Sequence, residues 1–286
     1  MILLEPFSYD YMNNAMLMAG LVGGVCAFLS AYLMLKGWSL IGDALSHSVV
    51  PGVAGAYMLG LPFALGAFLA GGLAALAMLF LSERSGLKID TIIGIIFTSF
   101  FGLGLFLISL WPMSVSIKTI VFGNILSVTP EDTVQLLLIS LVAISILIFR
   151  WKDLMVTFFD EEHARSVGLN PTRLKLLFFM LLSASVVAAM KTVGAFLVIA
   201  LVITPGATAY LICDRFPRLI MLSVFIGVLS SVLGTYISYF LDGATGGVIV
   251  TLQLVMFLVT FIAAPKYGLI ASRRKARAEM IYQGSA

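Results

Sequence analysis

The chain has 286 residues, of which 61% are hydrophobic and 11% are charged, and its mean hydropathy is +1.10. Soluble globular domains carry roughly 25% charged residues, so this composition excludes a soluble domain and indicates a polytopic membrane protein. The net charge of +3 is small, and the basic residues border apolar segments, which speaks against any binding of nucleic acid.

Nine apolar stretches follow one another along the chain, and most approach the roughly 20 residues that a spanning helix needs. They lie at 15–35, 40–59, 63–81, 91–111, 134–149, 174–190, 192–213, 219–241 and 246–264. The stretches at 134–149 and 174–190 are short, so eight spans remain an alternative to nine. We therefore predict an all-α transmembrane helical bundle of eight to nine spans that forms a single domain over residues 1–286.

Lysines and arginines orient these spans. With nine spans and the N-terminus outside, fifteen of the 17 Lys and Arg residues fall on the inside, and only Lys118 and Lys191 fall outside. Cytoplasmic loops of membrane proteins carry such an excess of basic residues. The asymmetry favours nine spans, an N-terminus outside and a cytoplasmic C-terminus.

Asp43 and His47 interrupt the second apolar stretch. Four residues of separation place both side chains on one face of a helix, about 6 Å apart along its axis. Burial of a carboxylate and an imidazole in a membrane is costly and marks a functional site, and both groups are ligands for divalent transition metals. In the alternative interpretation, the pair only bonds to itself and joins two helices. Two ligands do not complete a metal shell, so water, backbone carbonyls near Pro51 or Pro205, or a second subunit must supply the rest.

The longest connection predicted on the inside runs from Arg150 to Lys175 and has an acidic centre. Asp160 suits an N-cap, the two glutamates after it suit the positive start of a helix, and Gly168 suits the stop. The sequence therefore predicts a short helix at about 160–168. Such a helix has no core of its own and needs a partner surface; a solvated acidic loop is the alternative.

The run Thr204-Pro205-Gly206 interrupts a late apolar stretch. Pro205 removes a helical hydrogen bond and Gly206 loosens the backbone, so a kink is expected here. Irregular backbone is tolerated in a membrane only where protein or a cavity satisfies the freed groups. We interpret Thr204, Pro205 and Gly206, together with Pro51 one turn after His47, as pore-lining kinks. A structural kink that faces another helix is the alternative.

These motifs resemble those of one known family, the permeases of ATP-binding-cassette importers for manganese, zinc and iron. The run Ser39–Gly52, with its Gly-Asp-Ala-x-Ser-His core and Pro-Gly exit, resembles that family's most specific motif. The loop Phe159–Gly168 resembles its coupling region, and Leu201–Tyr210 resembles its late-span motif. The resemblance covers essentially the whole chain and is strongest to the bacterial manganese/iron permeases.

The resemblance implies a multi-pass permease of the bacterial inner membrane that transports a divalent metal and is not itself an enzyme. It implies a second permease chain, two cytoplasmic ATPase subunits and an extracytoplasmic metal-binding protein as partners. This sequence contains no Gly-x-x-x-x-Gly-Lys-Ser/Thr motif for ATP. The resemblance assigns metal binding to Asp43 and His47. It assigns coupling to the ATPase to Asp160, Glu161, Glu162, Ala164 and Gly168.

One oxygen ligand and one nitrogen ligand favour Mn²⁺ or Fe²⁺ as the transported metal, with Zn²⁺ as the alternative and no permanently bound cofactor. Two other functions remain open. In a proton-coupled secondary transporter the pair relays protons, and a membrane scaffold has no transport path. Retention of an ATPase subunit in detergent supports the importer, whereas transport driven by a proton gradient without ATP supports the secondary transporter.

Overall fold

The computed structural model describes residues 2–38, 40–110, 129–264 and 268. Within these ranges the chain forms helices and turns without a β-strand, which confirms the all-α fold class. In chain order the helices are η1 (Ile2–Ser8), α1 (Asp10–Lys36), α2 (Ile41–Ser48), α3 (Val50–Leu59), α4 (Phe63–Arg84), α5 (Ile89–Leu110), α7 (Pro130–Phe159), α8 (Glu161–Ser166), α9 (Pro171–Val193), α10 (Ala195–Ile212), α11 (Phe216–Leu241) and α12 (Thr245–Ala263).

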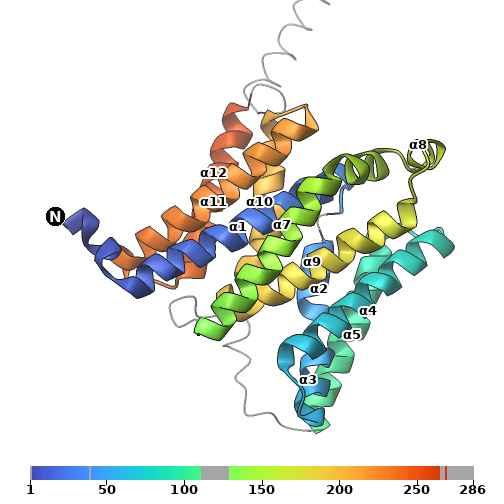
Figure 1. Cartoon of the computed structure of the whole chain (residues 1–286), viewed down its shortest axis with the longest axis horizontal. Helices are drawn as coiled ribbons and strands as arrows, with labels where there is room; N and C mark the ends of the chain where they lie inside the picture. Colours follow the sequence, from blue (N-terminus) through green and yellow to red (C-terminus); the bar gives the residue numbers. More distant parts are fainter. Residues whose placement is uncertain (1, 39, 111–128, 265–267, 269–286) are drawn as a thin grey trace, which may run out of the picture.

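Eight helices in the described part of the chain are long and apolar enough to cross a membrane: α1, α4, α5, α7, α9, α10, α11 and α12. The apolar stretch predicted at 40–59 instead forms two shorter helices, α2 and α3, which are separated by Val49. Figure 1 shows α2 within the bundle and α3 beside α4 and α5. Counted as one broken crossing, α2 and α3 bring the described part of the chain to nine crossings, within the predicted eight to nine.

The break between α2 and α3 lies where the sequence predicted a kink. Pro51 has no N–H, so it cannot donate the helical hydrogen bond to the carbonyl of His47. Gly52 then allows α3 to approach α4 closely, because a Cβ atom at this position would collide with the backbone of Gly66. The candidate ligands Asp43 and His47 consequently lie on a helix of only eight residues.

α7 is longer than the sequence predicted, because the apolar stretch 134–149 is only part of a helix of 30 residues. Arg150 does not end the helix, since it forms a 2.9 Å ion pair with Asp153 at the i,i+3 spacing that helices favour. The connection predicted to begin at Arg150 therefore begins only after Phe159. The stretch 174–190 is likewise part of a longer helix, α9, of 23 residues.

α1 occupies the centre of the bundle and packs against α7, α9, α10 and α11. Gly23 of α1 lies against the backbone of Gly227 of α11, where a Cβ atom would not fit. The hydroxyl of Ser223 on α11 donates a 2.7 Å hydrogen bond to the carbonyl of Ala27 on α1. This close packing makes α1 and α11 one unit against which the other helices are arranged.

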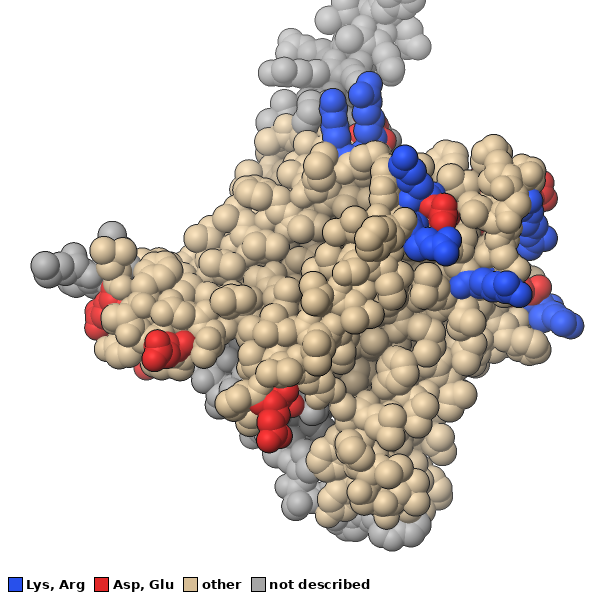
Figure 2. Space-filling model, in the orientation of Figure 1, with Lys and Arg blue, Asp and Glu red and all other residues tan. Residues whose placement is uncertain are grey.

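Charged side chains gather at two ends of the bundle (Figure 2). Lys and Arg side chains cluster at the end where α1 and α4 finish, at Lys36 and Arg84, while acidic side chains alone mark the opposite end of the face shown. α1 starts at the acidic end at Asp10, and α12 finishes toward the basic end, as an odd number of crossings requires. Lys118 and the side chain of Lys191, both predicted on the outside, lie beyond the described part of the chain.

Candidate functional site

Asp43 and His47 lie side by side on α2, as their spacing predicts. His47 Nε2 is 3.5 Å from Asp43 Oδ1, and 32% of the His47 side chain and 40% of the Asp43 side chain remain exposed. The neighbouring hydroxyls do not compete for them, because Ser46 and Ser48 donate to carbonyls of their own helix at 2.9 and 2.7 Å. The pair is therefore open on one side and available to a ligand.

The ring of His47 is held by α5. Phe97 and Phe101 stack on each other, and the imidazole meets both rings edge-on with centroid distances of 5.4 and 5.5 Å. Such edge-on contacts between aromatic rings are favourable and fix their orientation. The two phenylalanines thus orient the imidazole while leaving its contact with Asp43 in place.

As candidate metal ligands, Asp43 and His47 would be an incomplete set. Among the described residues there is no group of three or more His, Cys, Asp or Glu side chains that could hold a metal ion. A transition metal takes four or more ligands, so a metal ion bound here would need water, backbone carbonyls or another chain as well. A carboxylate and an imidazole supply one oxygen and one nitrogen, a combination that accepts Mn²⁺, Fe²⁺ and Zn²⁺.

α10 continues as one helix through Pro205, and α1 contacts it on both sides of the proline. Ser30 Oγ donates to the carbonyl of Ile203 at 3.2 Å and accepts from the N–H of Gly206 at 3.1 Å, on either side of Pro205. A Cβ atom on Gly206 would collide with Ser30. This geometry favours the structural interpretation of the kink. Thr204 is only half-buried, and a pore-lining role for it stays a prediction.

α8 begins and ends at the residues that the sequence indicated. The Asp160 carboxylate accepts the N–H groups of Glu162 and His163 at 3.0 and 3.1 Å, which is N-cap geometry. Gly168 has φ +83°, and its N–H donates to the carbonyl of Arg165 at 3.1 Å. The methyl group of Ala164 is fully buried and packs α8 against the rest of the protein. α8 is thus a well-delimited turn and a half at the basic end of the bundle (Figure 1).

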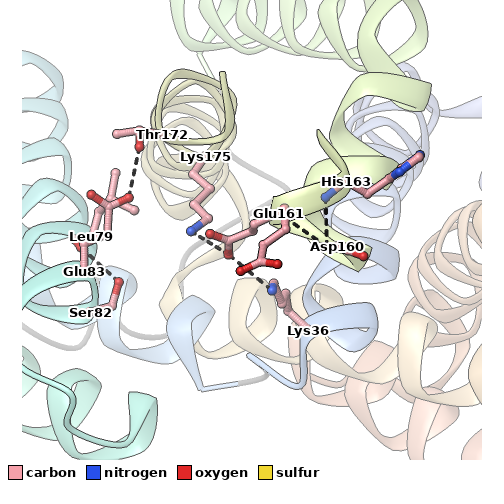
Figure 3. Close-up of polar contacts among 10 residues, drawn as sticks. Lys36, Leu79, Ser82, Glu83, Asp160, Glu161, His163, Thr172 and Lys175 are labelled. Carbon is pink, nitrogen blue, oxygen red and sulfur yellow. Dashed lines mark hydrogen bonds and ion pairs between the residues drawn. The ribbon is translucent and has the colours of Figure 1, made fainter. Parts of the chain in front are cut away.

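Sequence reasoning missed the partners of Glu161. Figure 3 shows Lys36, the last residue of α1, and Lys175 of α9 approaching this one carboxylate. Glu161 Oε1 lies 2.7 Å from Lys175 Nζ and 3.4 Å from Lys36 Nζ. Partial burial alone would raise the pKa of the Glu161 carboxyl, but the hydrogen bond and charge of Lys175 and the charge of Lys36 outweigh it and lower the pKa. A lysine at the start of an apolar stretch, as Lys175 is, was the available signal.

A second polar contact at the basic end ties α4 to α9. The hydroxyl of Thr172 donates to Glu83 Oε1 at 3.1 Å (Figure 3). Both residues are exposed, so this bond contributes little by itself. It nevertheless places the end of α4 next to the region occupied by Glu161 and Lys175.

Comparisons with known proteins agree with this architecture. The sequence model of the ABC 3 transport family matches residues 8–264. The chain is 60% identical to the chelated iron transport system membrane protein YfeC of Yersinia pestis, over 96% of this chain and 94% of YfeC. It is 44% identical to the manganese transport system membrane protein MntB of Synechocystis sp., over 96% of this chain and 90% of MntB.

A solved structure shares the fold. PsaBC from Streptococcus pneumoniae in complex with Fab superposes with a TM-score of 0.82 at 37% identity, over 93% of this chain and 98% of that one. An inward-facing, putative metal-chelate type ABC transporter, 22% identical, has the same fold with a TM-score of 0.68. The similarity therefore extends over the membrane domain as a whole and is not confined to the short motifs.

Proposed function

The chain belongs to the ABC 3 transport family, and from this premise we propose that it is the permease subunit of an ATP-binding-cassette importer that carries Mn²⁺ or Fe²⁺ into the cytoplasm. Relatives that match nearly the whole chain are membrane proteins of iron and manganese transport systems. The sequence contains no ATP-binding motif, so ATP hydrolysis is assigned to a separate partner chain.

The observation that carries this proposal is the pair Asp43 and His47. Both side chains are partly exposed within a transmembrane bundle, on a broken helix, with their polar atoms 3.5 Å apart. Ionisable groups in such a place are rare and mark ion pathways. Carboxylate oxygen suits the harder Mn²⁺ and Fe²⁺, and Zn²⁺ is the second candidate because imidazole also suits zinc.

The partners follow from the two ends and the open site. The excess of Lys and Arg supports a basic end, with α8, that faces the cytoplasm and the ATPase subunits, and an N-terminus on the outside. The acidic end then faces the extracytoplasmic metal-binding protein. Because Asp43 and His47 are an incomplete and open ligand set, a second permease chain packed against this side is proposed to help enclose the metal.

Reconstitution of the permease with its ATPase subunits in liposomes tests the proposal. Manganese should enter only when ATP is present, and a proton gradient without ATP should drive no uptake. Competition among Mn²⁺, Fe²⁺ and Zn²⁺ for entry then ranks the three metals. Proton-driven uptake without ATP would assign the protein to the secondary transporters instead.

A further inference from the structure

Three charged residues from three helices meet at the start of α8 (Figure 3). They are Lys36, Glu161 and Lys175, and together they are here called the lysine clamp. Lys36 ends α1, Glu161 begins α8, and Lys175 lies in the second turn of α9. Both ammonium groups approach the same oxygen, Glu161 Oε1, at 3.4 and 2.7 Å. One carboxylate therefore joins α1 to two helices, α8 and α9, that lie more than 120 residues later in the sequence.

The α1 side of the clamp leads directly to the candidate metal site. Lys36 is the last residue of α1, and α2, which carries Asp43 and His47, begins five residues later at Ile41. Few residues separate the clamp from these ligands, so a displacement of Lys36 has a short covalent route to α2.

Trp38 lies between α1 and α2 and packs against α7 and α9 at the basic end. Its ring stacks on Phe179 of α9 at 5.6 Å and meets Phe158 of α7 edge-on at the same distance. Phe158 is in turn two residues before Asp160, the N-cap of α8. Trp38, between α1 and α2, thus packs against the end of α7 just before α8 begins. This aromatic contact adds to the ion pair between Lys36 and Glu161.

We propose that Glu161 is a positioning residue for transport, which ties α8 through Lys36 to the start of the metal-carrying helix α2. This inference rests on the proposed function, in which the ATPase subunit binds α8. Displacement of α8 on ATP binding or hydrolysis is then carried by the clamp to α1 and α2, and so to Asp43 and His47. Loss of metal reaches α8 by the same link in the opposite direction.

Burial makes the α9 side of the clamp dependent on Glu161. Only 6% of the Lys175 side chain is exposed, and a buried ammonium needs an anionic partner to offset the loss of hydration. Glu161 supplies that partner, and its lowered pKa keeps it ionised at neutral pH. If the Glu161 charge is removed, two neighbouring lysines are left without it, and α8 loses its polar contact with α1.

The surroundings of the clamp leave room for movement. A polar cavity of about 520 Å³ lies beside it, lined by Trp38, Glu161 and Lys175 together with Arg84 and Arg165. Space on this side allows α8 to shift without collision with the end of α4. The ion pair between Arg150 and Asp153, by contrast, lies within α7 and connects no second helix.

The test uses the permease assembled with its ATPase subunits in liposomes, with manganese as the probe. Lys36→Met removes the α1 side of the clamp and leaves α8 itself unaltered. We expect metal-stimulated ATP hydrolysis to fall roughly threefold or more, with manganese affinity and ATPase association retained. Lys36→Arg keeps the positive charge and should restore coupling. Asp153→Asn, which breaks an ion pair within one helix, is the matched control and should couple normally.

A double-variant cycle sharpens the test. Glu161→Gln breaks the contact with Lys175 as well as the one with Lys36, so it should lower metal stimulation at least as far as Lys36→Met does. The double variant should fall no further than Glu161→Gln alone, because the contact between Lys36 and Glu161 is already lost. Additive losses, or wild-type stimulation in Lys36→Met, would overturn the inference. Failure of both single variants to assemble would assign the clamp to folding and overturn it as well. If the wild-type assembly shows no stimulation by metal, the proposed function itself fails, which is a distinct result.

Discussion

Charged groups come together in opposite ways at two places in the molecule. One is the pair Asp43 and His47 on α2, and the other is the lysine clamp at the basic end. Asp43 and His47 lie on one helix, 3.5 Å apart, and each side chain is about one-third or more exposed. The lysine clamp joins three helices, with a 2.7 Å contact to a side chain that is only 6% exposed. Charges that bind a cargo must stay available to it, whereas charges that connect helices are best paired within the protein.

This contrast predicts different consequences of damage. A substitution at Asp43 or His47 should remove the proposed cargo site, while the permease still assembles with its ATPase subunits. A change at the basic end should leave the cargo site intact and separate it from ATP hydrolysis. The following predictions test that division, beginning with the largest expected effect.

Asp43→Ala and His47→Ala should each abolish metal uptake. Each variant removes one of the two proposed side-chain ligands. Loss of a residue behind a metal ligand already costs roughly 10–100-fold in metal affinity, so uptake should fall by roughly 100-fold or more. ATP-driven manganese uptake into liposomes measures this loss. Ser46→Ala, which removes a hydroxyl bonded within the same helix, is the control and should transport normally. Wild-type uptake by both assembled Ala variants would make the pair structural.

Gly168→Val should uncouple or detach the ATPase without loss of metal binding. Gly168 has φ +83°, and no atom lies within 4 Å of a Cβ built there, so the effect comes from the backbone alone. A left-handed conformation costs an L-residue roughly 1–2 kcal/mol, and a β-branched one most. Pull-down of the ATPase and metal-stimulated hydrolysis measure the loss, which we expect to be about tenfold.

Gly168→Asn is the matched variant, because asparagine tolerates the left-handed region better than other residues with a side chain. It should retain the ATPase and most of the coupled hydrolysis. Normal association and coupling in Gly168→Val would refute the proposed contact between α8 and the ATPase.

Acidification should weaken uptake severalfold. Metal binding needs a neutral imidazole and an ionised carboxylate, so added protons compete with the metal. The pKa of Glu161 is lowered, so its contribution to stability is present at neutral pH and is lost only as the pH falls through that lowered value. Uptake and the integrity of the assembly, followed together from about pH 8 to 5, should separate the two regions. Uptake that rises on acidification at constant ATP would favour a proton-coupled carrier.

Ser30→Ala should have the smallest effect on transport and should act on stability. The variant leaves the Gly206 N–H and the Ile203 carbonyl without their α1 partner, at a cost of roughly 1–3 kcal/mol. Thermal unfolding in detergent measures this loss, and Ser223→Ala is a control that removes a bond from α1 at another place. Loss of uptake at unchanged stability would instead show that the α10 kink lines the transport path.

Features decided by neighbouring residues were predictable. Long apolar stretches indicated the membrane bundle because a lipid environment forces each spanning backbone into a helix. Asp160 and Gly168 marked the two ends of α8, since capping depends on local side-chain chemistry and backbone angle. Pro51 marked the break in the second span because it lacks a donor, whatever surrounds it.

The ends of the spans were less predictable. α7 continues past Arg150 to Phe159, although the apolar pattern stops at the arginine. A hydropathy pattern reports where lipid contact ends, whereas the helix continues as long as its hydrogen bonds and side-chain pairs favour it. The inside connection was therefore predicted too long, even though the short helix within it was placed correctly.

The amino-acid sequence alone determined that this is an α-helical membrane protein, that its second apolar stretch breaks near Pro51, and that Asp43 and His47 share a face. Those properties depend on residues within a few positions of one another. The tertiary structure alone decided that Ser30 bonds to Gly206, 176 residues away and next to Pro205. It also decided that Glu161 pairs with Lys36, across 125 residues of sequence. A polar residue in an apolar stretch of sequence indicates that it needs a partner, but only the packing of the helices determines which partner lies within reach.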